Sequence, residues 1–404
     1  MSRIKIKNFG PIKVGNPIND GWIDIKRVTV FIGNQGSGKS TVAKLISSFM
    51  WLEKALIRGD IKPPILFCDL IKFHRLENYL QPDTQIEYEG NSYRLTLSDN
   101  STERTIKATE LNKNSIRQPK IMYVPAERNF LSSITNINKV SDLIIGSLKS
   151  YSVEFRNAQL AYKNEPIDLP INNTKITYNS EEDENYLMFN GKKLKLSEAS
   201  SGFHSFVPLY WVTKYSIEYL KQKGEKLLTL LSTDQTIRRN NELQELNTQE
   251  LDEETLRKKV TKINEKYISK YFVNIIEEPE QNLYPNSQRE LLNSLLAFNN
   301  ADNLLIMTTH SPYLINYISL AVKADELKEK ITCKELRNEL NSIVPINSTI
   351  NPKELVIYEL DETDGSVNKL DDFEGIPSDQ NFLNSFLKQT NNLFDALLEI
   401  EENL

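Results

Sequence analysis

The stretch Gly33-Asn34-Gln35-Gly36-Ser37-Gly38-Lys39-Ser40-Thr41 carries the most informative pattern in the chain, G-x-x-x-x-G-K-[ST]. An apolar run over residues 28–32 precedes it, and apolar residues at helical spacing follow it. Glycines at these positions let consecutive backbone N–H groups turn toward one anion, and the N-terminal end of the helix adds positive charge. The sequence therefore predicts a phosphate-binding loop between a strand and a helix.

Two polar side chains of this loop have roles that the pattern predicts. Lys39 has the reach to contact the outer phosphates of a nucleotide, and the Ser40 hydroxyl can bind Mg²⁺. An ordinary glycine-rich turn is the alternative, and the strand and helix on either side argue against it.

Composition is that of a globular protein with a real core. The 404 residues are 39% hydrophobic and 26% charged, with a net charge of −6 that argues against a surface basic all over. A local basic stripe would still suffice for nucleic acid. No apolar run is long enough to span a membrane, and the first residues alternate like a strand rather than a signal peptide. Cys68 and Cys333 form no disulfide framework or metal cluster. We expect a cytoplasmic protein without membrane partners.

Periodicity predicts the order of the elements. Strands are expected at residues 3–9, 23–25, 28–32, 120–124, 271–276, 303–308 and 355–360. Hairpins are expected at 86–97, turning at Gly90-Asn91, and at 186–196, turning at Asn190-Gly191. Helices are expected at 39–58, 65–80, 140–163, 202–222 and from 381 onward, with a charged helix pair over 238–270.

A second informative segment is Asn274-Ile275-Ile276-Glu277-Glu278-Pro279-Glu280. Two adjacent carboxylates at the end of a buried strand are costly unless a metal ion or a water molecule uses them. Glu277 would hold Mg²⁺, and Glu278 would polarise the attacking water. An acidic turn is the alternative, and the phosphate-binding loop makes it less attractive.

Two further segments fit the same chemistry. In Ile306-Met307-Thr308-Thr309-His310-Ser311-Pro312 a strand ends near His310, where an imidazole could touch a γ-phosphate. A lone histidine is more often structural, but this one follows the next strand after Glu278. The turn Ser200-Ser201-Gly202 opens a helix whose N–H groups could bind an anion, although it is also an ordinary N-cap.

These four motifs, in this order, resemble those of ATP-binding-cassette (ABC) class ATPases. More narrowly, the chain resembles the soluble RecF/SMC/OLD-like branch (the AAA_15/AAA_21 type), whose opening strand is similar to residues 3–11 and whose Glu-Glu-Pro-Glu segment is similar to residues 277–285. The resemblance implies an α/β P-loop NTPase: an ABC-type head with a mixed sheet, a helical lobe carrying the signature, and a short helical insertion.

The resemblance also implies roles for particular residues. Gly33 to Thr41 would be the Walker A loop, Glu277 the Walker B acid and Glu278 the catalytic base, with Lys39 and His310 as further catalytic residues. Ser40 and Glu277 would bind Mg²⁺, and Ser200, Ser201 and Gly202 would be the signature that meets the ATP of a second subunit. The implied cofactors are ATP and Mg²⁺, and the implied assembly is a nucleotide-dependent homodimer or higher homo-oligomer.

Three departures from the family pattern stand out. The Walker B acid is Glu277, which is the residue of the OLD-like branch, whereas transporters have Asp at this position. Phe203 replaces the glutamine or glutamate that follows the signature glycine. No Q-loop glutamine can be placed. Residues 123–130 lie where this glutamine is expected, and Glu127 and Arg128 are the candidates to replace it. A surface salt bridge is the alternative role for Arg128.

We expect one domain over residues 1–404. Its parts would be an N-terminal lobe with Walker A (1–135), a helical signature lobe (136–225), a charged helical insertion (226–270), the Walker B and switch-histidine region (271–340) and a C-terminal strand–helix extension (341–404). The residues after Pro312 lack the acidic pattern of the nuclease domain of OLD-like proteins, and Asp361-Glu362 and Asp371-Asp372 are expected in solvated turns. The sequence therefore predicts a stand-alone ATPase without nuclease activity.

The leading functional hypothesis is an Mg²⁺-dependent ATPase whose dimerisation gates a separate effector of the nuclease type, as in bacterial anti-phage systems. The second is a RecF/SMC-like repair or maintenance protein that clamps DNA when ATP closes the dimer, with phosphate contacts from Arg238-Arg239, Lys192-Lys193-Lys195 and Arg257-Lys258-Lys259. The third is a slow, ATP-locked scaffold, motivated by Phe203.

Overall fold

The computed structural model describes residues 2–98, 104–111, 117–134, 144–222, 228, 231, 233–249, 251–299 and 302–402. Its centre is a mostly parallel sheet in which only the edge strand β16 runs antiparallel. The strands in order across the sheet are β16 (Val367–Lys369), β15 (Leu355–Leu360), β3 (Val28–Gly33), β14 (Leu304–Thr308), β13 (Ser269–Glu277) and β8 (Gln118–Val124). Because β15, β3, β14, β13 and β8 are parallel, their carboxyl ends meet at one edge.

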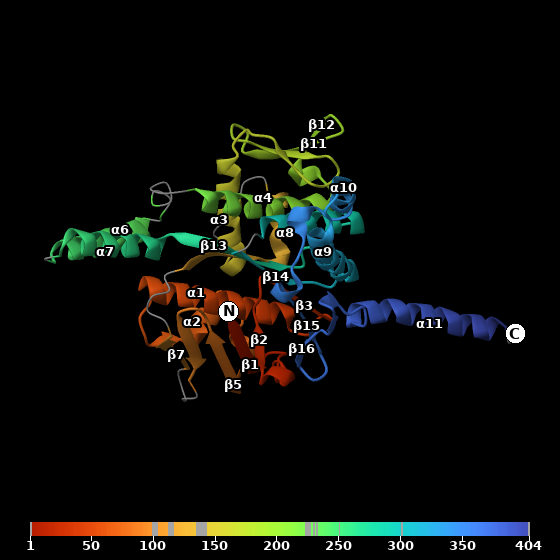
Figure 1. Cartoon of the computed structure of the whole chain (residues 1–404), viewed down its shortest axis with the longest axis horizontal. Coiled ribbons are helices and arrows are strands. Elements are labelled where there is room, and N and C mark those ends of the chain that lie inside the picture. The colour runs from red at the N-terminus through yellow and green to blue at the C-terminus, as the bar shows by residue number, and fades with distance from the viewer. Residues whose placement is uncertain are drawn as a thin grey trace.

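A second, antiparallel sheet faces the central one, and helix α1 (Lys39–Arg58) lies between them (Figure 1). Its strands in order are β2 (Trp22–Asp24), β1 (Arg3–Phe9), β5 (Leu80–Glu89), β6 (Tyr93–Leu97), β7 (Thr105–Glu110) and β4 (Ile65–Leu66). Glu53 of α1 accepts hydrogen bonds from the N–H groups of Ser92 (2.7 Å) and Tyr93 (3.2 Å). A Cβ at Gly90 would lie 2.1 Å from Glu53 Oε2, so this turn requires glycine.

The central strands are apolar on both faces because each face has its own core. Val28, Val30 and Ile32 pack into the cluster with the large helices, whereas Phe31 packs toward α1 and stacks on Tyr358 (ring centroids 5.7 Å apart). Such double burial requires the unbroken apolar run of β3 and is typical of parallel strands.

The helical lobe stands on the other side of the central sheet, at the top of Figure 1. It contains α3 (Gly146–Ala161), α4 (Ser201–Lys221) and a small sheet of β12 (Lys192–Lys195), β11 (Glu184–Phe189), β10 (Lys175–Asn179) and β9 (Ile167–Asp168). Trp211 of α4 is fully buried between Tyr162 (6.4 Å, parallel rings) and Phe155 (6.0 Å, edge to face). These contacts join α4 to α3.

The remaining helices cover this face or project from the body. Helices α8 (Pro285–Phe298) and α9 (Pro312–Lys330) contribute to the core of the helical side, and α10 (Lys334–Ile343) follows. The pair α6 (Thr233–Asn247) and α7 (Glu253–Tyr267) projects to the left in Figure 1, and α11 (Phe382–Glu402) projects to the right. Within the described ranges, no helix combines the length and the apolar character that a bilayer crossing requires.

Most predicted elements are confirmed. The predicted helix over residues 39–58 has the observed bounds of α1, and Gly59 ends it in a left-handed conformation (φ 73°). The predicted helix over 65–80 is wrong. That segment forms β4, a short helix α2 (Phe67–Lys72) and a 3₁₀ turn (Glu77–Tyr79), because Arg75 has φ 58° and Leu80 pairs with Phe9 to begin β5.

The predicted 140–163 helix begins later, at Gly146, and residues 140–143 lie outside the described residues. The charged helix pair is confirmed but ends at Tyr267, and β13 begins at Ser269. The division into lobes stays a prediction.

Candidate functional site

The candidate site lies at the edge where the parallel strands end. Thr308 at the end of β14 pairs with Glu277 on one side and with Phe31 on the other, and Ile276 pairs with Val124 of β8. The loops that follow β3, β14, β13 and β8 therefore emerge side by side. In open parallel sheets this is the edge where ligands bind.

The loop after β3 has the backbone that the glycine pattern requires. Gly33, Gly36 and Gly38 have φ values of 143°, 82° and 101°. A Cβ at Gly33 would lie 2.5 Å from the Leu360 carbonyl oxygen, and one at Gly38 would lie 2.6 Å from Ile12 Cδ1. Nothing lies within 4 Å of the Cβ position of Gly36, so the loop is open there. This is the close-approach geometry that a phosphate cradle needs.

Lys39 places its ammonium group inside the loop. Its Nζ donates hydrogen bonds to the carbonyl oxygens of Gly33 (2.9 Å) and Asn34 (2.7 Å). Burial lowers the pKa of Lys39 to about 8, and the charges of Glu278, Glu280 and Glu362 oppose that shift. An anion bound at the loop would add an attractive charge and raise the pKa again.

Glu277 is buried at the end of β13 and already has several partners. The Tyr123 hydroxyl donates a hydrogen bond to its Oε1, the Ala126 N–H donates to Oε2 (3.4 Å), and Lys44 Nζ lies 3.6 Å from Oε1. Lys44 is one helical turn beyond Ser40, so the start of α1 faces Glu277. The half-buried Ser40 hydroxyl and the Glu277 carboxylate suit Mg²⁺, because Mg²⁺ binds few protein oxygens when phosphates supply its other ligands.

Glu278 and His310 meet beside this pair. Glu278 adopts φ 44°, a left-handed conformation that is uncommon for this residue type, and its N–H donates to the Thr308 carbonyl (2.9 Å). His310 Nε2 lies 3.7 Å from Glu278 Oε1, and their side chains remain 36% and 37% exposed. Burial, and secondarily the charge of Lys39, lower the pKa of His310, so its imidazole is neutral at pH 7. A backbone held in this conformation is typical of functional sites.

Glu280 holds the His310 loop in place. Its Oε1 accepts hydrogen bonds from Thr309 Oγ1 (2.8 Å) and from the His310 N–H (2.8 Å). Burial raises the pKa of Glu280. This carboxyl group therefore links the loop after β13 to the loop after β14.

Arg128 is fully buried, so the surface salt bridge considered from the sequence is wrong. Its guanidinium donates to the carbonyl oxygens of Glu277 (2.7 Å) and Glu278 (2.6 Å), and its Nε donates to the Ser205 carbonyl (3.1 Å). Burial lowers the pKa of Arg128, but an arginine stays charged throughout the physiological range. One side chain thus positions the backbone of both acidic residues and ties it to α4.

A proline strengthens the same connection. Pro208 lies inside α4 and lacks an N–H group, so the His204 carbonyl loses its usual helical donor. The Ser132 hydroxyl donates to that carbonyl at 2.9 Å. The segment that carries Arg128 and Ser132, the 3₁₀ helix Ala126–Ser133, is therefore bonded to α4 at two successive carbonyl oxygens.

The turn Ser200-Ser201-Gly202 lies at the start of α4. Ser200 and Ser201 are exposed at the start of α4, and Gly202 packs against the Asn282 carbonyl, 3.0 Å from its Cβ position. Among the described residues, no hydrogen bond or ion pair joins this turn to Gly33–Thr41. The structure thus brings Glu277, Glu278 and His310 to the loop and leaves the turn open to solvent.

Several contact residues were missed from the sequence. Tyr123 and Lys44 contact Glu277, and Asn34 Nδ2 donates to Glu362 Oε1 at 2.9 Å. The spacing of four residues between Ser40 and Lys44 was the available signal for Lys44. Glu362 is exposed, as its predicted solvated turn implies, yet it also contacts the loop through Asn34. Phe203 packs against the core of the helical lobe, which gives this departure from the family pattern a structural role.

One stretch of the chain is similar to a known protein family. Residues 255–315, which include Glu277, Glu278 and His310, match the model of the AAA ATPase domain family AAA_15. A search of curated proteins found no match.

Among solved structures, the SMC head domain from Thermotoga maritima is 12% identical, with 92% of this chain and 98% of that chain covered and a TM-score of 0.38. The Smc head domain with an extended coiled coil bound to the C-terminal domain of ScpA, derived from Pyrococcus furiosus, is 9% identical, with 92% and 96% covered and a TM-score of 0.39. A nucleotide-free ATP-binding cassette from an ABC transporter is 14% identical, with 93% of each chain covered and a TM-score of 0.30. These scores are low, so the fold assignment rests on the strand order and the phosphate loop.

The strand order, the phosphate loop and the acidic residues Glu277 and Glu278 at the end of β13 together define an α/β P-loop ATPase head of the ABC type. Over residues 255–315, the match to AAA_15 agrees with the predicted resemblance to the AAA_15/AAA_21 type.

The role of Arg128 can be tested with Arg128→Lys. We expect ATP turnover to fall about 10- to 100-fold, because a lysine cannot hold several carbonyl groups in one plane and small misplacements of reacting groups are costly. ATP binding should change little, since Arg128 does not contact the loop. Arg94→Lys is the matched control, because Arg94 is exposed and pairs with Glu89 in the antiparallel sheet. Wild-type turnover in Arg128→Lys would contradict this assignment.

Proposed function

We propose that the protein binds ATP with Mg²⁺ at the loop Gly33–Thr41 and hydrolyses the ATP between two copies of the chain. The observation that carries the proposal is the convergence of the loop, Glu277, Glu278 and His310 at one sheet edge, while the turn Ser200–Gly202 is exposed at the start of α4. A site divided in this way is complete only when a second chain supplies the turn.

Each residue has a distinct task in this proposal. The loop N–H groups and Lys39 bind the phosphates, while Ser40 and Glu277 hold Mg²⁺, which when bound neutralises phosphate charge. Glu278 accepts a hydrogen bond from the attacking water and orients it. The neutral His310 donates a hydrogen bond to the outermost phosphate, where negative charge accumulates.

The start of α4 suits the trans contact. Ser201 is its first residue, and the helix dipole places partial positive charge there. Exposed N–H groups and hydroxyls at this end would bind the phosphates held by the other chain. ATP therefore joins the two heads, and its hydrolysis releases them.

The output of this switch, in our proposal, is control of a separate effector of the nuclease type, in bacterial anti-phage defence. Support comes from the resemblance to the ATPase heads of such systems, which is an argument by analogy. A direct role on DNA has less support, because three of the basic residues considered for it have acidic or amide partners within the chain. Arg238 pairs with Asp60 (2.8 Å), Arg239 donates to Asn264 (2.7 Å), and Lys258 pairs with Glu254 (2.5 Å).

Two substitutions test the ATP site. Lys39→Ala should weaken ATP binding roughly 10- to 100-fold, because charge-assisted hydrogen bonds are lost. Glu278→Gln should retain binding and slow hydrolysis by about 10² to 10⁴, the usual contribution of a general base. Equilibrium binding of a fluorescent ATP analogue and phosphate release measure the two effects. Intact binding in Lys39→Ala would overturn the site, and unchanged turnover in Glu278→Gln would favour the locked scaffold.

Mixing two inactive variants tests the shared site. Ser201→Glu places a carboxylate where the ATP of the other chain should bind, although a negative charge at a helix start favours folding. Neither Lys39→Ala nor Ser201→Glu should hydrolyse ATP alone. A mixed dimer regains one complete site, so an equal mixture should recover roughly a quarter of wild-type turnover. No recovery from two folded variants would show that the site is not shared in this way.

The effector can be sought with the trapped state. Glu278→Gln loaded with ATP should remain dimeric and retain the effector during native purification from the source cell. Mass spectrometry should then identify a protein that is absent when Lys39→Ala is used as bait. Recovery of DNA in place of a protein, with salt-sensitive affinity, would favour the clamp hypothesis.

A further inference from the structure

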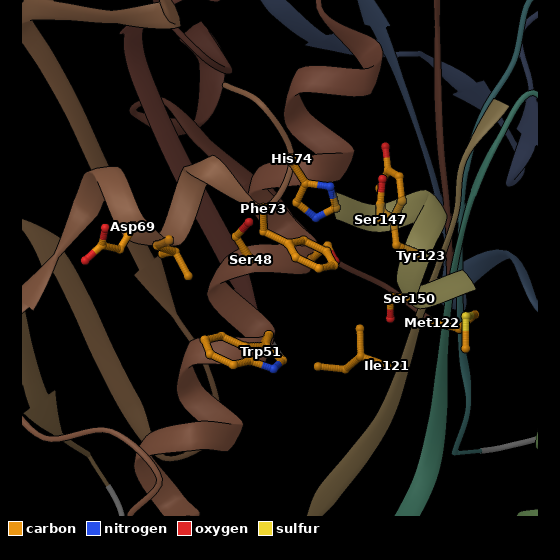
Figure 2. A pocket seen from close by; sticks show the side chains of 12 residues that line it. Ser48, Trp51, Asp69, Phe73, His74, Ile121, Met122, Tyr123, Ser147 and Ser150 are labelled. Atoms are coloured by element: carbon orange, nitrogen blue, oxygen red, sulfur yellow. The ribbon is translucent and has the colours of Figure 1, made fainter. Parts of the chain in front are cut away.

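A cavity of about 370 Å³ opens between α1, α2, β8 and α3 (Figure 2). None of the residues of the phosphate loop, Gly33–Thr41, lines it. Its volume lies in the range of small-molecule sites. No role in the proposed ATP chemistry requires such a space.

Three buried polar atoms of residues that line the cavity have no hydrogen-bond partner among the residues that the structure describes. They are Ser48 Oγ and both ring nitrogens of His74. His74 is only 4% exposed, and burial lowers the pKa of its imidazole to about 3. The ring is therefore neutral, with one nitrogen that donates and one that accepts. Orphaned buried groups of this kind are costly, so a ligand with complementary groups would be favoured.

The rest of the wall indicates the shape and charge of such a ligand. Trp51 and Phe73 are large aromatic side chains that remain 45% and 44% exposed, and both lie around the same space as His74 in Figure 2. Their faces offer stacking surfaces to a flat ring. Asp69 also lines the cavity and would repel an anion.

We propose that this cavity binds a neutral, planar heteroaromatic molecule of the nucleobase class. Its ring stacks on Trp51 and Phe73, and its polar edge exchanges hydrogen bonds with His74 and Ser48. A free nucleoside and an unpaired base of a nucleic-acid strand share this chemistry.

Two connections join the cavity to the candidate ATP site, and the first is Tyr123. The His74 ring packs on Tyr123, with centroids 4.5 Å apart, and the Tyr123 hydroxyl donates to Glu277. Helix α1 makes a second connection, because it carries Lys44 beside Glu277 and Ser48 at the cavity. The ligand therefore regulates the switch by moving Glu277. This regulatory step, unlike the binding itself, rests on the proposed function.

Titration of the full-length protein tests the binding step without ATP. The probes are adenosine, guanosine, cytidine and uridine, and the corresponding single-stranded homo-oligonucleotides, followed by calorimetry. At least one nucleoside should bind. His74→Phe, which keeps a ring but removes both polar atoms, should weaken that binding tenfold or more, and His74→Gln should restore part of it. Trp51→Ala should also weaken it, whereas Phe373→Ala, at an exposed aromatic outside the cavity, should not.

The outcomes separate the sources and the sites. Tighter binding of an oligonucleotide than of its nucleoside identifies an unpaired base, and the reverse identifies the free molecule. Titration in saturating Mg²⁺ and ADP should leave the cavity able to bind. Loss of binding under that condition, binding unchanged by both His74→Phe and Trp51→Ala, or no binding by any probe would overturn the proposal.

Regulation has its own readout. The bound nucleoside should change the affinity for Mg²⁺ and ATP severalfold, and ATP should change nucleoside affinity by the same factor. Tyr123→Phe removes one of the two connections, so it should weaken that coupling and leave nucleoside binding intact. Nucleoside binding without coupling would overturn the regulatory step alone, and absence of ATP binding altogether would overturn the proposed function while leaving the cavity assignment in place.

Discussion

The parallel register of β3, β14 and β13 is the constraint on which the candidate site depends. Backbone hydrogen bonds place Thr308 between Phe31 and Glu277, so three loops from distant parts of the chain begin at the same height. Glu278 then bonds to Thr308 and Glu280 bonds to the His310 loop, which extends this alignment beyond the sheet. A shift of one residue in the register would turn Glu277 to the opposite face.

Arg128 carries the alignment from the sheet edge to the helical lobe. Burying a guanidinium is costly unless its donors are satisfied, and here they bond carbonyl oxygens on both sides of the connection. Movement of α4 against a second chain would therefore reach the backbone of Glu277 and Glu278. The proline in α4 adds to this link, because the carbonyl oxygen that it frees is bonded by Ser132.

Local pattern predicted elements well where the pattern and the tertiary contacts agree. Helix α1 has a strong apolar face and ends at glycine, and its predicted bounds match those observed. Over residues 65–80 the apolar spacing favoured a helix, but pairing of Leu80 with Phe9 recruited the end of the segment into a sheet. Strand pairing between residues so far apart in sequence can outweigh local helix propensity, and the local sequence pattern does not reveal it.

The candidate residues of the site could be selected from the amino-acid order, because the motifs of a phosphate loop, an acidic strand end and a histidine loop each need only neighbouring residues. The contacts that organise this chemistry come from the fold. Tyr123 reaches Glu277, Asn34 reaches Glu362, and Arg128 reaches both α4 and β13 across long stretches of chain. Partners and burial at such separations follow from how sheets and helices pack, so only the tertiary structure reveals them, and the same is true of the cavity around His74.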